Sequence, residues 1–337
     1  MNQLRGAVIG YGGAFNMGKQ HAQQMAQHGI AFAAACDVDP ARAAQAKADF
    51  PDIEVFTNPD ELLAREDVDL VTVITPHYTH AELGKRILAA GKHCILEKPM
   101  CIQASDGYEM TMLAREKGRM LSVYHNRRWD GWYLTLKELM AKGIIGDIFH
   151  IEMAFGGFGR PRDWWRSDKD VSGGALYDWG AHLIDYALGV VPGGIRSVRG
   201  VVHNRVWHEF TNEDHVDSTI YMENGAVINV QISSIAHAGK PHIRLLGTKG
   251  GIVDANIFDG ELTLYTDLNG VKVETKVPTA KDQGQLYYAN VADHLYRGAE
   301  LIVRPEQALR NIAVIETTER SAAAGQELPV PYEELHK

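Results

Sequence analysis

The chain has 337 residues, enough for two domains, and its hydrophobic fraction of 45% and charged fraction of 23% are ordinary for a soluble globular protein. A formal net charge of -9 argues against broad contact with nucleic acid or with an anionic membrane. No apolar run reaches the roughly 20 residues of a membrane helix and no signal peptide is visible before the first predicted strand, so a cytoplasmic protein is expected.

Short apolar runs alternate with helical patterns over about the first 120 residues. The predicted strands are Arg5–Gly10, Ile30–Asp37, Glu54–Thr57, Leu70–Thr75, His93–Glu97 and Met120–Tyr124. The predicted helices are Met17–His28, Pro40–Asp49, Pro59–Arg65, His80–Ala90 and Ser105–Lys117. Continuous apolar strands separated by helices indicate a parallel sheet covered on both faces, which is the doubly wound α/β pattern of a Rossmann domain.

The pattern changes after Tyr124. Helices are predicted over Trp132–Lys142, Gly174–Leu188 and 305–324, a strand over Asp147–Phe155, and longer strands between Arg196 and Val277. Asn224-Gly225 is typical of a hairpin turn, and the strand that follows alternates apolar and polar residues. We therefore expect a Rossmann domain over residues 1-123 and an α+β domain over residues 124-337 with a large open, mostly antiparallel sheet. An open sheet needs a cover, so a homodimer or homotetramer formed through it is expected.

A glycine-rich loop follows the first predicted strand and precedes the first helix, where backbone amides and a helix N-terminus can receive a pyrophosphate. Its glycines are spaced more widely than in GxGxxG, because the third is reached only at Gly18. A tight structural turn is the alternative. The expected cofactor contacts in the loop are Gly10, Gly12, Gly13, Phe15, Asn16 and Met17.

Asp37 ends the second predicted strand, where a carboxylate can accept hydrogen bonds from the ribose hydroxyls of NAD and would repel the 2′-phosphate of NADP. The nearest arginine is Arg42, so NAD is favoured over NADP. A turn or helix-capping role is the alternative for Asp37. Thr75-Pro76 and Glu97-Lys98-Pro99 follow the fourth and fifth strands, at the carboxyl ends where ligands bind.

A second cluster contains Asp178, His182 and Asp185, which would share one face of a helix. Oxidation of a carbinol needs a base for the hydroxyl proton, and histidine titrates near neutrality. A carboxylate can orient that histidine, and a lysine such as Lys98 can stabilise the developing negative charge. A structural Asp–His pair is the alternative. The three cysteines form no CxxC pair and the histidines lack an accompanying ligand set, so no metal site is expected.

At this point the chain resembles the glucose–fructose oxidoreductase / inositol dehydrogenase / MocA family over most of its length. The resemblance is carried by the glycine loop and by several motifs. These are Cys36-Asp37-Val38-Asp39-Pro40, Thr75-Pro76-His77-Tyr78-Thr79-His80, Ala90-Gly91-Lys92-His93-Cys94-Ile95-Leu96-Glu97-Lys98-Pro99, Asn126-Arg127-Arg128 and Gly173–Asp185.

The resemblance implies an NAD-dependent oxidoreductase with Lys98, Asp178 and His182 as the catalytic set and His182 as acid/base. It implies that Thr75, Pro76, His80, Glu97, Lys98 and Asn126 line the cofactor, and that the Lys98–Pro99 bond is cis. The expected substrate-binding residues are Lys98, Arg127, Trp164, Trp165, Arg166, Asp178 and His182. For the tryptophans, aromatic packing between the domains is the alternative.

The expected reaction is oxidation of a secondary alcohol of a sugar, cyclitol or glycoside to a ketone, with hydride passing to nicotinamide C4. A small polyol or sugar is the expected partner. Two other functions stay open at this stage. One is a glycoside-cleaving enzyme that retains NAD through oxidation, elimination and reduction. The other is an NAD sensor without catalysis.

Overall fold

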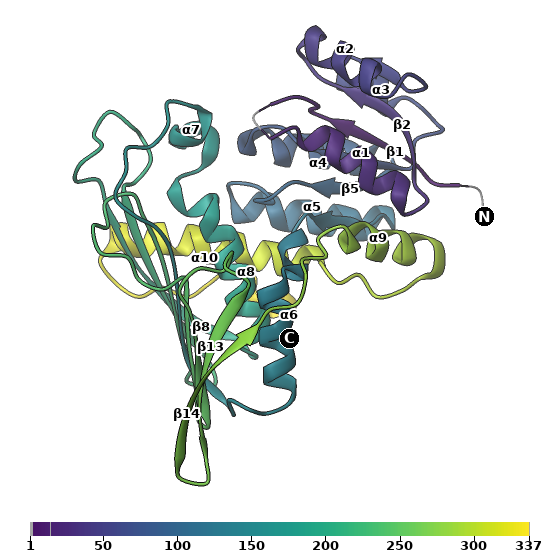
Figure 1. The fold of residues 1–337 in the computed structure, drawn as a ribbon. Coiled ribbons are helices and arrows are strands. Elements are labelled where there is room, and N and C mark those ends of the chain that lie inside the picture. The colour runs from purple at the N-terminus through teal and green to yellow at the C-terminus, as the bar shows by residue number, and fades with distance from the viewer. Residues whose placement is uncertain (1–2, 14, 337) are drawn as a thin grey trace. The chain divides into compact units, whose positions relative to one another are not determined.

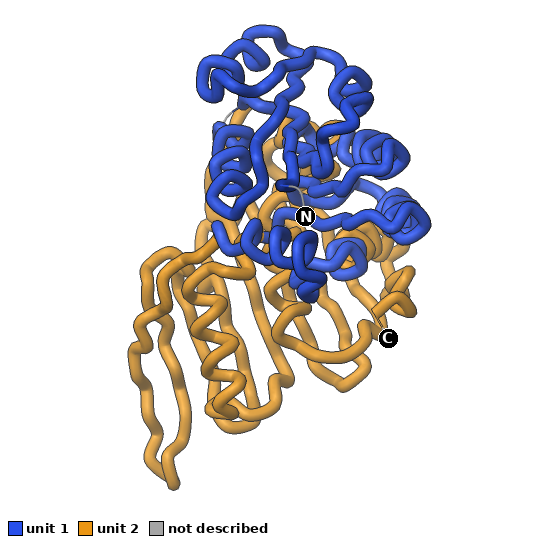
Figure 2. Tube along the Cα trace, turned by 90° about the vertical axis from the view of Figure 1, so that its right-hand side faces the viewer, with its two compact units in different colours: residues 1–125, 285–309 blue, residues 126–284, 310–337 orange. Residues whose placement is uncertain are grey.

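The computed structural model describes residues 3–13 and 15–336 and divides the chain into two compact units (Figure 2). Unit 1 comprises residues 1–125 and 285–309, and unit 2 comprises residues 126–284 and 310–337. The chain thus leaves unit 1 after His125 and returns to it for the segment 285–309. Among the described residues, no helix is long and apolar enough to span a membrane.

Unit 1 is built on a six-stranded parallel sheet with the strand order β3-β2-β1-β4-β5-β6 (Figure 1). The strands are β1 (Arg5–Ile9), β2 (Ala31–Cys36), β3 (Glu54–Phe56), β4 (Leu70–Val73), β5 (His93–Leu96) and β6 (Leu121–Val123). The helices are α1 (Met17–Gln27), α2 (Pro40–Asp49), α3 (Pro59–Leu63), α4 (His80–Ala89), α5 (Ala104–Lys117) and α9 (Leu286–Arg297), with a 3₁₀ turn η1 (His77–Thr79). The predicted doubly wound α/β fold is confirmed.

The strands of unit 1 are buried on both faces, as a parallel sheet between helices requires. Val8, Val71 and Ile95, from three neighbouring strands, have no exposed surface. The strand order reverses between β1 and β4. This reversal is the topological switch point, and the loops after β1 and β4 are therefore where a ligand of such a sheet binds.

Unit 2 carries an eight-stranded sheet with the order β14-β13-β12-β11-β7-β10-β9-β8. The strands are β7 (Ile148–Gly156), β8 (Ile195–His203), β9 (His215–Met222), β10 (Val227–Ser233), β11 (Ile243–Gly247), β12 (Gly250–Asp254), β13 (Glu261–Leu268) and β14 (Val271–Pro278). Neighbouring strands are antiparallel except β7 and β10, which run parallel. The predicted open, mostly antiparallel sheet is confirmed.

The remaining helices are α6 (Gly131–Ala141), α7 (Lys169–Ser172), α8 (Trp179–Val190) and α10 (Pro305–Ala324), with 3₁₀ turns η2 (Asn126–Trp129), η3 (Trp165–Ser167), η4 (Ala175–Tyr177) and η5 (Glu333–His336). In unit 2, α8 packs on β7 and β10. The α10 helix reaches the same face of the sheet, where the Thr318 and Ser218 hydroxyls lie 2.7 Å apart. The core of unit 2 lies between this face and these helices.

The two faces of the sheet in unit 2 differ, as the alternation along β10 predicts. Ile228 and Val230 are fully buried, whereas Asn229 and Gln231 point to the opposite face and are half-buried. The predicted hairpin between β9 and β10 is also present. Gly225 has φ 87°, and the Asn224 side chain accepts a hydrogen bond from the Ala226 amide at 3.0 Å.

The helix predicted over Gly174–Leu188 begins later than expected. Gly173 and Gly174 adopt φ of 90° and 132°, and this left-handed backbone stops helix propagation. The η4 turn follows, and α8 begins only at Trp179. Asp178 is the N-cap residue, with φ -83° and ψ -91°. Asp178 therefore directly precedes the helix that contains His182 and Asp185, and its own backbone is not helical.

Candidate active site

The glycine loop of unit 1 is shaped by two close backbone approaches. Gly10 has φ 88°, and a Cβ there would lie 2.6 Å from the Ile74 carbonyl oxygen after β4. A Cβ on Gly18, at the start of α1, would lie 2.6 Å from the Tyr11 carbonyl oxygen. Gly18 therefore lets α1 pack against the loop, although it comes later than in the usual spacing.

The other loop residues extend between these two glycines. Gly13 has φ 113° and Asn16 has φ 51°, and Asn16 directly precedes Met17 at the start of α1. The Phe15 side chain is exposed over 56% of its surface. Ala14, in the middle of the loop, lies outside the described residues. Loop amides and a helix N-terminus are thus placed at the switch point, as a pyrophosphate site requires.

The Asp37 carboxylate closes this loop from the end of β2. One oxygen accepts hydrogen bonds from the Tyr11 amide at 2.8 Å and the Gly12 amide at 3.4 Å, and the other accepts from the Asp39 amide at 3.0 Å. The side chain is almost buried, at 6% exposure. Asp37 thus has a structural part in the turn, and an ionised carboxylate still has acceptor capacity for a ligand.

Arg42 reaches the loop although it is five residues past Asp37. A Cβ on Gly12 would lie 2.5 Å from the Arg42 Cδ, so the arginine side chain covers this glycine. The Arg42 Nε lies 3.6 Å from the Asp39 carboxylate. Arg42 and Gly12 are far apart in the sequence, so the sequence gave little reason to expect this contact. The contact forms because the first turn of α2 lies beside the loop.

His80 ties together the loops that follow β4 and β5. Its Nε2 lies 2.9 Å from the Thr75 carbonyl oxygen and its Nδ1 lies 2.8 Å from the Pro99 carbonyl oxygen. Burial lowers the pKa of this imidazole although both carbonyl contacts favour the charged form. Each ring nitrogen faces a carbonyl oxygen and a neutral ring donates to one of the two, so His80 contacts the loops of the candidate cofactor site through their backbone. Thr75 is held further by its hydroxyl, 2.5 Å from the Thr79 hydroxyl.

Glu97 and Lys98 follow β5, and the Lys98–Pro99 peptide bond is cis, as the resemblance implied. The Glu97 carboxylate accepts a hydrogen bond from the Lys98 amide at 3.0 Å and lies 3.1 Å from the His21 Nε2. Pro76 and Pro99 stand directly after these strand ends, where a proline cannot extend the ladder.

The candidate substrate residues of unit 2 gather around Asp178. The Arg166 Nη1 donates a hydrogen bond to the Asp178 Oδ1 at 2.6 Å. The same guanidinium lies 5.3 Å from the ring centroid of Trp164 and 5.1 Å from that of Trp165. The aromatic and basic residues before α8 are therefore linked to a predicted catalytic carboxylate by an ion pair and by cation–π contacts.

His182 lies on the first turns of α8 with 6% of its surface exposed. Its ring is edge-on to Trp179, with centroids 5.6 Å apart, and is stacked over Tyr186 at 6.5 Å. Asp185, three residues later, accepts two hydrogen bonds from Arg128 at 2.8 and 2.6 Å and one from Asn311 at 3.0 Å. Asp185 therefore joins η2, α8 and α10.

Asn126 and Arg127 begin unit 2. The Asn126 amide lies against Gly284, where a Cβ would come within 3.2 Å of its Nδ2. Arg127 donates to Asp130 at 3.0 Å, and its guanidinium lies 4.8 Å from the Trp179 ring centroid. Burial opposes the charge of Arg127, but the neighbouring Tyr186 and Asp130 outweigh it and raise the pKa of the guanidinium.

Sequence reasoning missed an aromatic cluster in unit 2 that consists of Phe155, Trp179 and Phe258. Phe155 of β7 stacks on Trp179 with centroids 3.8 Å apart and planes 18° apart, and the Phe258 ring is edge-on to Trp179 at 6.0 Å. Trp179 stands directly beside Asp178 in the sequence, which was the available signal. Phe155 and Phe258 come from distant strands and loops and carried no such signal.

Each unit thus assembles its own set of predicted residues. Unit 1 holds Gly10, Gly12, Gly13, Phe15, Asn16, Met17, Asp37, Thr75, Pro76, His80, Glu97 and Lys98. Unit 2 holds Asn126, Arg127, Trp164, Trp165, Arg166, Asp178 and His182. Lys98 therefore belongs to a different unit from the other two members of the predicted catalytic set.

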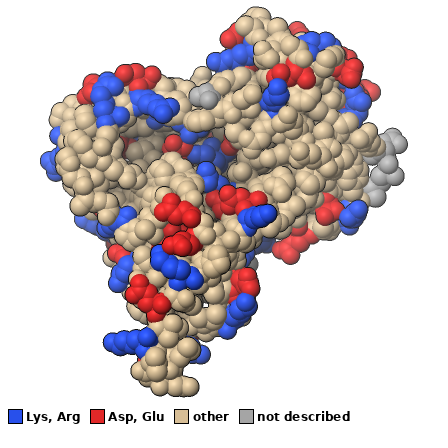
Figure 3. All heavy atoms as spheres, in the orientation of Figure 1, with Lys and Arg blue, Asp and Glu red and all other residues tan. Residues whose placement is uncertain are grey.

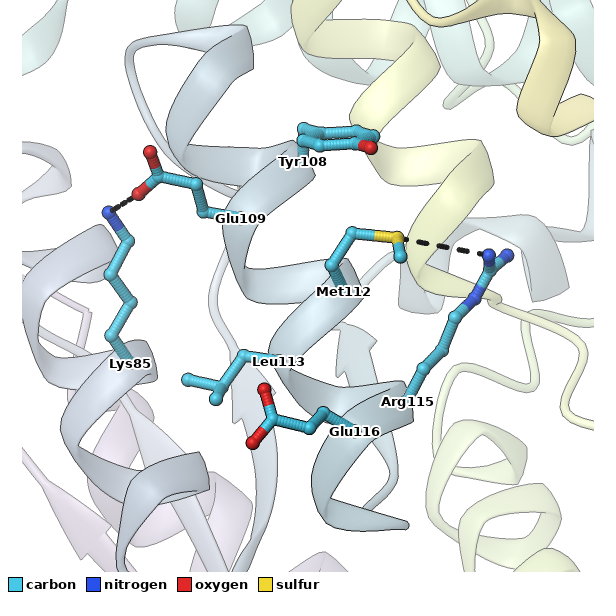
Figure 4. Close-up of a pocket in the computed structure, with 7 residues that line it drawn as sticks. All are labelled: Lys85, Tyr108, Glu109, Met112, Leu113, Arg115 and Glu116. Carbon is cyan, nitrogen blue, oxygen red and sulfur yellow. Dashed lines mark hydrogen bonds and ion pairs between the residues drawn. The ribbon is translucent and has the colours of Figure 1, made fainter.

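A surface groove of unit 1, with a volume of about 560 Å³, is lined by a separate set of residues (Figure 4). It runs beside α4 and α5, where Lys85 forms ion pairs with Asp106 at 2.7 Å and with Glu109. Arg115 points toward Met112 on the other side of α5. The groove contains none of the predicted site residues. Within the described residues, no group of three or more His, Cys, Asp or Glu side chains is arranged to hold a metal ion.

Two family models match the chain. The oxidoreductase family with an NAD-binding Rossmann fold matches residues 4–125, and the GFO/IDH/MocA C-terminal domain matches residues 133–253. Together the two matches span most of the sequence, and each falls on one of the two sheets described above.

Similar proteins agree with these matches. The chain is 30% identical to the uncharacterized oxidoreductase YdgJ of Escherichia coli, covering 82% of this chain and 85% of that protein. It is 30% identical to the scyllo-inositol 2-dehydrogenase (NADP(+)) IolW of Bacillus subtilis, covering 83% and 84%. An NAD-binding protein from Listeria innocua has a similar structure, with a TM-score of 0.86, 25% identity and 99% coverage of both chains. The chain therefore belongs to the GFO/IDH/MocA family of oxidoreductases with an NAD-binding Rossmann fold.

Proposed function

We propose that this oxidoreductase oxidises a secondary alcohol of a sugar, cyclitol or glycoside to a ketone, with NAD as the hydride acceptor. The proposal rests on one combination of features. Unit 1 has a glycine loop with room for a pyrophosphate and places Lys98 just after β5, and unit 2 supplies Asp178 and His182. A relative of comparable length is named as a scyllo-inositol dehydrogenase, which supports a polyol substrate.

The residues of unit 1 fit a dinucleotide. Gly10 and Gly18 keep side chains out of the loop, so that its amides and the α1 N-terminus can approach the pyrophosphate. Asp37 is the candidate acceptor for the ribose hydroxyls, and Thr75, Pro76, Glu97 and Asn126 are the candidates for the nicotinamide end. When bound, the nicotinamide supplies an electrophilic carbon, C4, that takes up hydride.

We propose NAD over NADP because the Asp37 carboxylate would repel a 2′-phosphate. The relative IolW is named for NADP(+), so the preference varies among similar proteins. Arg42, whose side chain covers Gly12, is the residue of this chain best placed to bind a 2′-phosphate, and its neighbour Asp39 offsets part of its charge. Comparing the two cofactors side by side tests this preference.

The proton chemistry falls to three side chains in this proposal. His182 accepts the hydroxyl proton, since an imidazole is the side chain that exchanges protons near neutral pH. Asp178, held by Arg166, orients the histidine or the substrate hydroxyl. Lys98 donates a hydrogen bond to the oxygen that becomes the ketone and stabilises its negative charge as the bond to hydrogen weakens.

Substrate recognition is proposed for Arg127, Trp164, Trp165 and Arg166, and also for Trp179, whose ring lies beside Arg127. An aromatic face suits the apolar side of a sugar ring, and guanidinium groups suit hydroxyl or carboxylate oxygens. We further propose that the chain acts as a homodimer or homotetramer in the cytoplasm. Its cysteines, Cys36, Cys94 and Cys101, are buried thiols, which fits a reducing compartment.

The test is a screen for absorbance growth at 340 nm with NAD or NADP and with inositols, aldoses, aldonic acids and simple glycosides. Lys98→Ala should lower kcat/KM by about 100-fold or more, because a donor to the developing charge is lost. Lys142→Ala is the matched control, since Lys142 is an exposed lysine at the end of α6.

Two results would contradict the proposal. One is equal activity of Lys98→Ala and the wild-type protein. The other is the absence of oxidation with every alcohol despite measurable NAD binding. Release of an aglycone from a glycoside without accumulation of NADH would instead indicate the enzyme that retains its cofactor through elimination.

A further inference from the structure

We propose that His21 and Tyr288 are positioning residues that act through Glu97 to hold the backbone of Lys98. The inference rests on the proposed function only for the catalytic role of Lys98. All the residues concerned lie in unit 1, and Tyr288 is contributed by α9, in the segment that returns to this unit from the distant end of the chain.

A continuous hydrogen-bonded chain joins these residues. The Thr72 hydroxyl on β4 lies 3.0 Å from the Tyr288 hydroxyl, which lies 2.8 Å from the His21 Nδ1. The His21 Nε2 lies 3.1 Å from one Glu97 oxygen, and the other Glu97 oxygen accepts the Lys98 amide at 3.0 Å. Thr72, His21 and Tyr288 are fully buried. Because these three side chains are buried, water cannot replace a hydrogen-bond partner that one of them loses.

The chemistry of Glu97 sets the direction of these hydrogen bonds. Burial opposes its ionisation, but the hydrogen bond and charge of His21, together with the charge and amide of Lys98, hold the pKa of this carboxyl below its usual range. An ionised carboxylate only accepts, so the His21 Nε2 carries the proton toward Glu97. The other ring nitrogen, Nδ1, lies 2.8 Å from the Tyr288 hydroxyl, so Tyr288 holds the ring in the orientation that presents Nε2 to Glu97.

Tyr288 can keep this role at any ordinary pH. Burial comes first among the causes that raise the pKa of its hydroxyl well above the usual value, so the proton stays on the oxygen. A hydroxyl held beside Nδ1 fixes the ring orientation that presents Nε2 to Glu97. The carboxylate in turn fixes the backbone amide of Lys98 just after β5. The position of this backbone sets the direction of the lysine side chain.

Tyr287 provides a matched control one residue away. It is buried like Tyr288, and its hydroxyl also bonds to a hydroxyl, that of Ser122 at 2.8 Å. Ser122 donates onward to the Val303 carbonyl oxygen at 2.9 Å. Tyr287→Phe and Tyr288→Phe each delete a buried hydroxyl from the same helix, but Tyr288→Phe breaks the chain that leads to Glu97.

The experiment measures backbone hydrogen exchange at the Lys98 amide in the full-length protein, which requires no substrate. We expect Tyr288→Phe to speed exchange of this amide by about tenfold or more, in line with a weakened hydrogen bond, and Tyr287→Phe to change it by less than about twofold. Equal effects of the two variants, or no effect of Tyr288→Phe, would overturn the proposal.

A second pair of variants covers the possibility that Tyr288→Phe unfolds. His21→Gln retains a side-chain N–H that can donate to Glu97, whereas His21→Leu does not. Slow exchange at Lys98 should persist in His21→Gln and be lost in His21→Leu. The same behaviour in both variants would contradict the positioning role.

Kinetics separates this inference from the proposed function. With a substrate in hand, Tyr288→Phe should lower kcat by about tenfold while KM for NAD stays within about twofold, because a misplaced lysine affects the reacting oxygen more than cofactor binding. If the wild-type protein oxidises no alcohol, the proposed function fails, and the exchange measurement still decides whether His21 and Tyr288 hold Lys98.

Discussion

At the scale of single residues, Asp254 at the end of β12 has a buried carboxyl group, and its hydrogen bonds offset only part of the cost of removing it from water. One oxygen accepts a hydrogen bond from the Asn256 amide at 3.0 Å, and the other is buried without a hydrogen-bond partner in the part of the chain that the structure describes. Burial is the main cause that raises the pKa of this group to about 6. The folded protein therefore binds a proton here that the unfolded chain releases near pH 4.

The sign of the effect follows from this difference in pKa. Since the folded state holds the proton more tightly, Asp254 lowers the free energy of unfolding as pH rises from about 4 to about 6, by roughly 2–3 kcal/mol. We expect Asp254→Asn to be more stable than the wild-type protein at pH 8, by about 1–2 kcal/mol after allowing for its own buried amide. At pH 4 the advantage should vanish. Urea denaturation at both pH values checks this, with the exposed Asp52→Asn as control, and a difference that is the same at both pH values would count against it.

At the scale of elements, the packing of α10 on the sheet of unit 2 depends on a glycine. A Cβ on Gly200 of β8 would lie 1.9 Å from the Thr318 carbonyl oxygen and 2.7 Å from its carbonyl carbon. The Gly200 amide also donates to the Ser321 hydroxyl at 2.9 Å. Backbone meets backbone at this contact, so neither side can avoid an added methyl group by changing a rotamer.

Gly200→Ala should therefore push α10 away from the sheet. Overpacking of this kind typically costs about 1–3 kcal/mol, and a backbone contact places the expectation at the upper end. Gly159→Ala is the control, because a Cβ there meets nothing within 4 Å. Calorimetry should show a lower Tm for Gly200→Ala only, and equal Tm values for the two variants would show that α10 can shift freely.

The elements themselves could be predicted from the sequence to the extent that their signals are local. Signals of only a few residues predict the glycine loop, the turn at Asn224-Gly225 and the apolar strands of unit 1, and the structure confirms these elements. The later start of α8 could not be predicted from helical spacing, because it depends on the left-handed backbone of Gly173 and Gly174. The return of α9 to unit 1 is also hidden, since Tyr288 meets Thr72 across 216 positions of sequence.

For the candidate site the limit is similar. Sequence motifs identified Glu97, but the residues that hold it, His21 and Tyr288, look like an ordinary core histidine and tyrosine until their contacts are seen. Asp178 was chosen from its i,i+4 spacing to His182, and that spacing could not reveal its hydrogen bond to Arg166, which lies in the segment before α8. Motifs thus locate the chemistry, and long-range contacts decide which groups support it.

At the scale of the whole molecule, α8 and α10 pack on one face of the sheet of unit 2, and the opposite face carries polar side chains of β10. Its central residues bond laterally along this face. Asn229 donates to Thr219 at 3.2 Å, Gln231 donates to Asp217 at 3.1 Å, and Arg244 donates to Glu152 at 2.8 Å. Because these polar groups already have partners, the face can be covered without leaving them unsatisfied.

The edge of the same sheet is protected against unwanted pairing. Edge strand β14 carries Lys272, Glu274 and Lys276, and side chains of both charges lie on the β13–β14 hairpin (Figure 3). Charged edge strands discourage the addition of further strands. The charges of β14 therefore disfavour association through this edge of the sheet.

We expect the wild-type protein to form dimers or tetramers in solution by placing this face against a second copy. Thr219→Arg puts a bulky charge on this face, beside Asn229 of β10, and should reduce the mass measured by light scattering to that of a smaller assembly, because an unpaired buried charge opposes association. Thr275→Arg, on the exposed edge strand β14, adds the same charge outside the face and should leave the mass unchanged. If the wild-type protein has the mass of one chain at all concentrations, this prediction is wrong. The face would then be exposed to water, with its polar side chains hydrogen-bonded to one another.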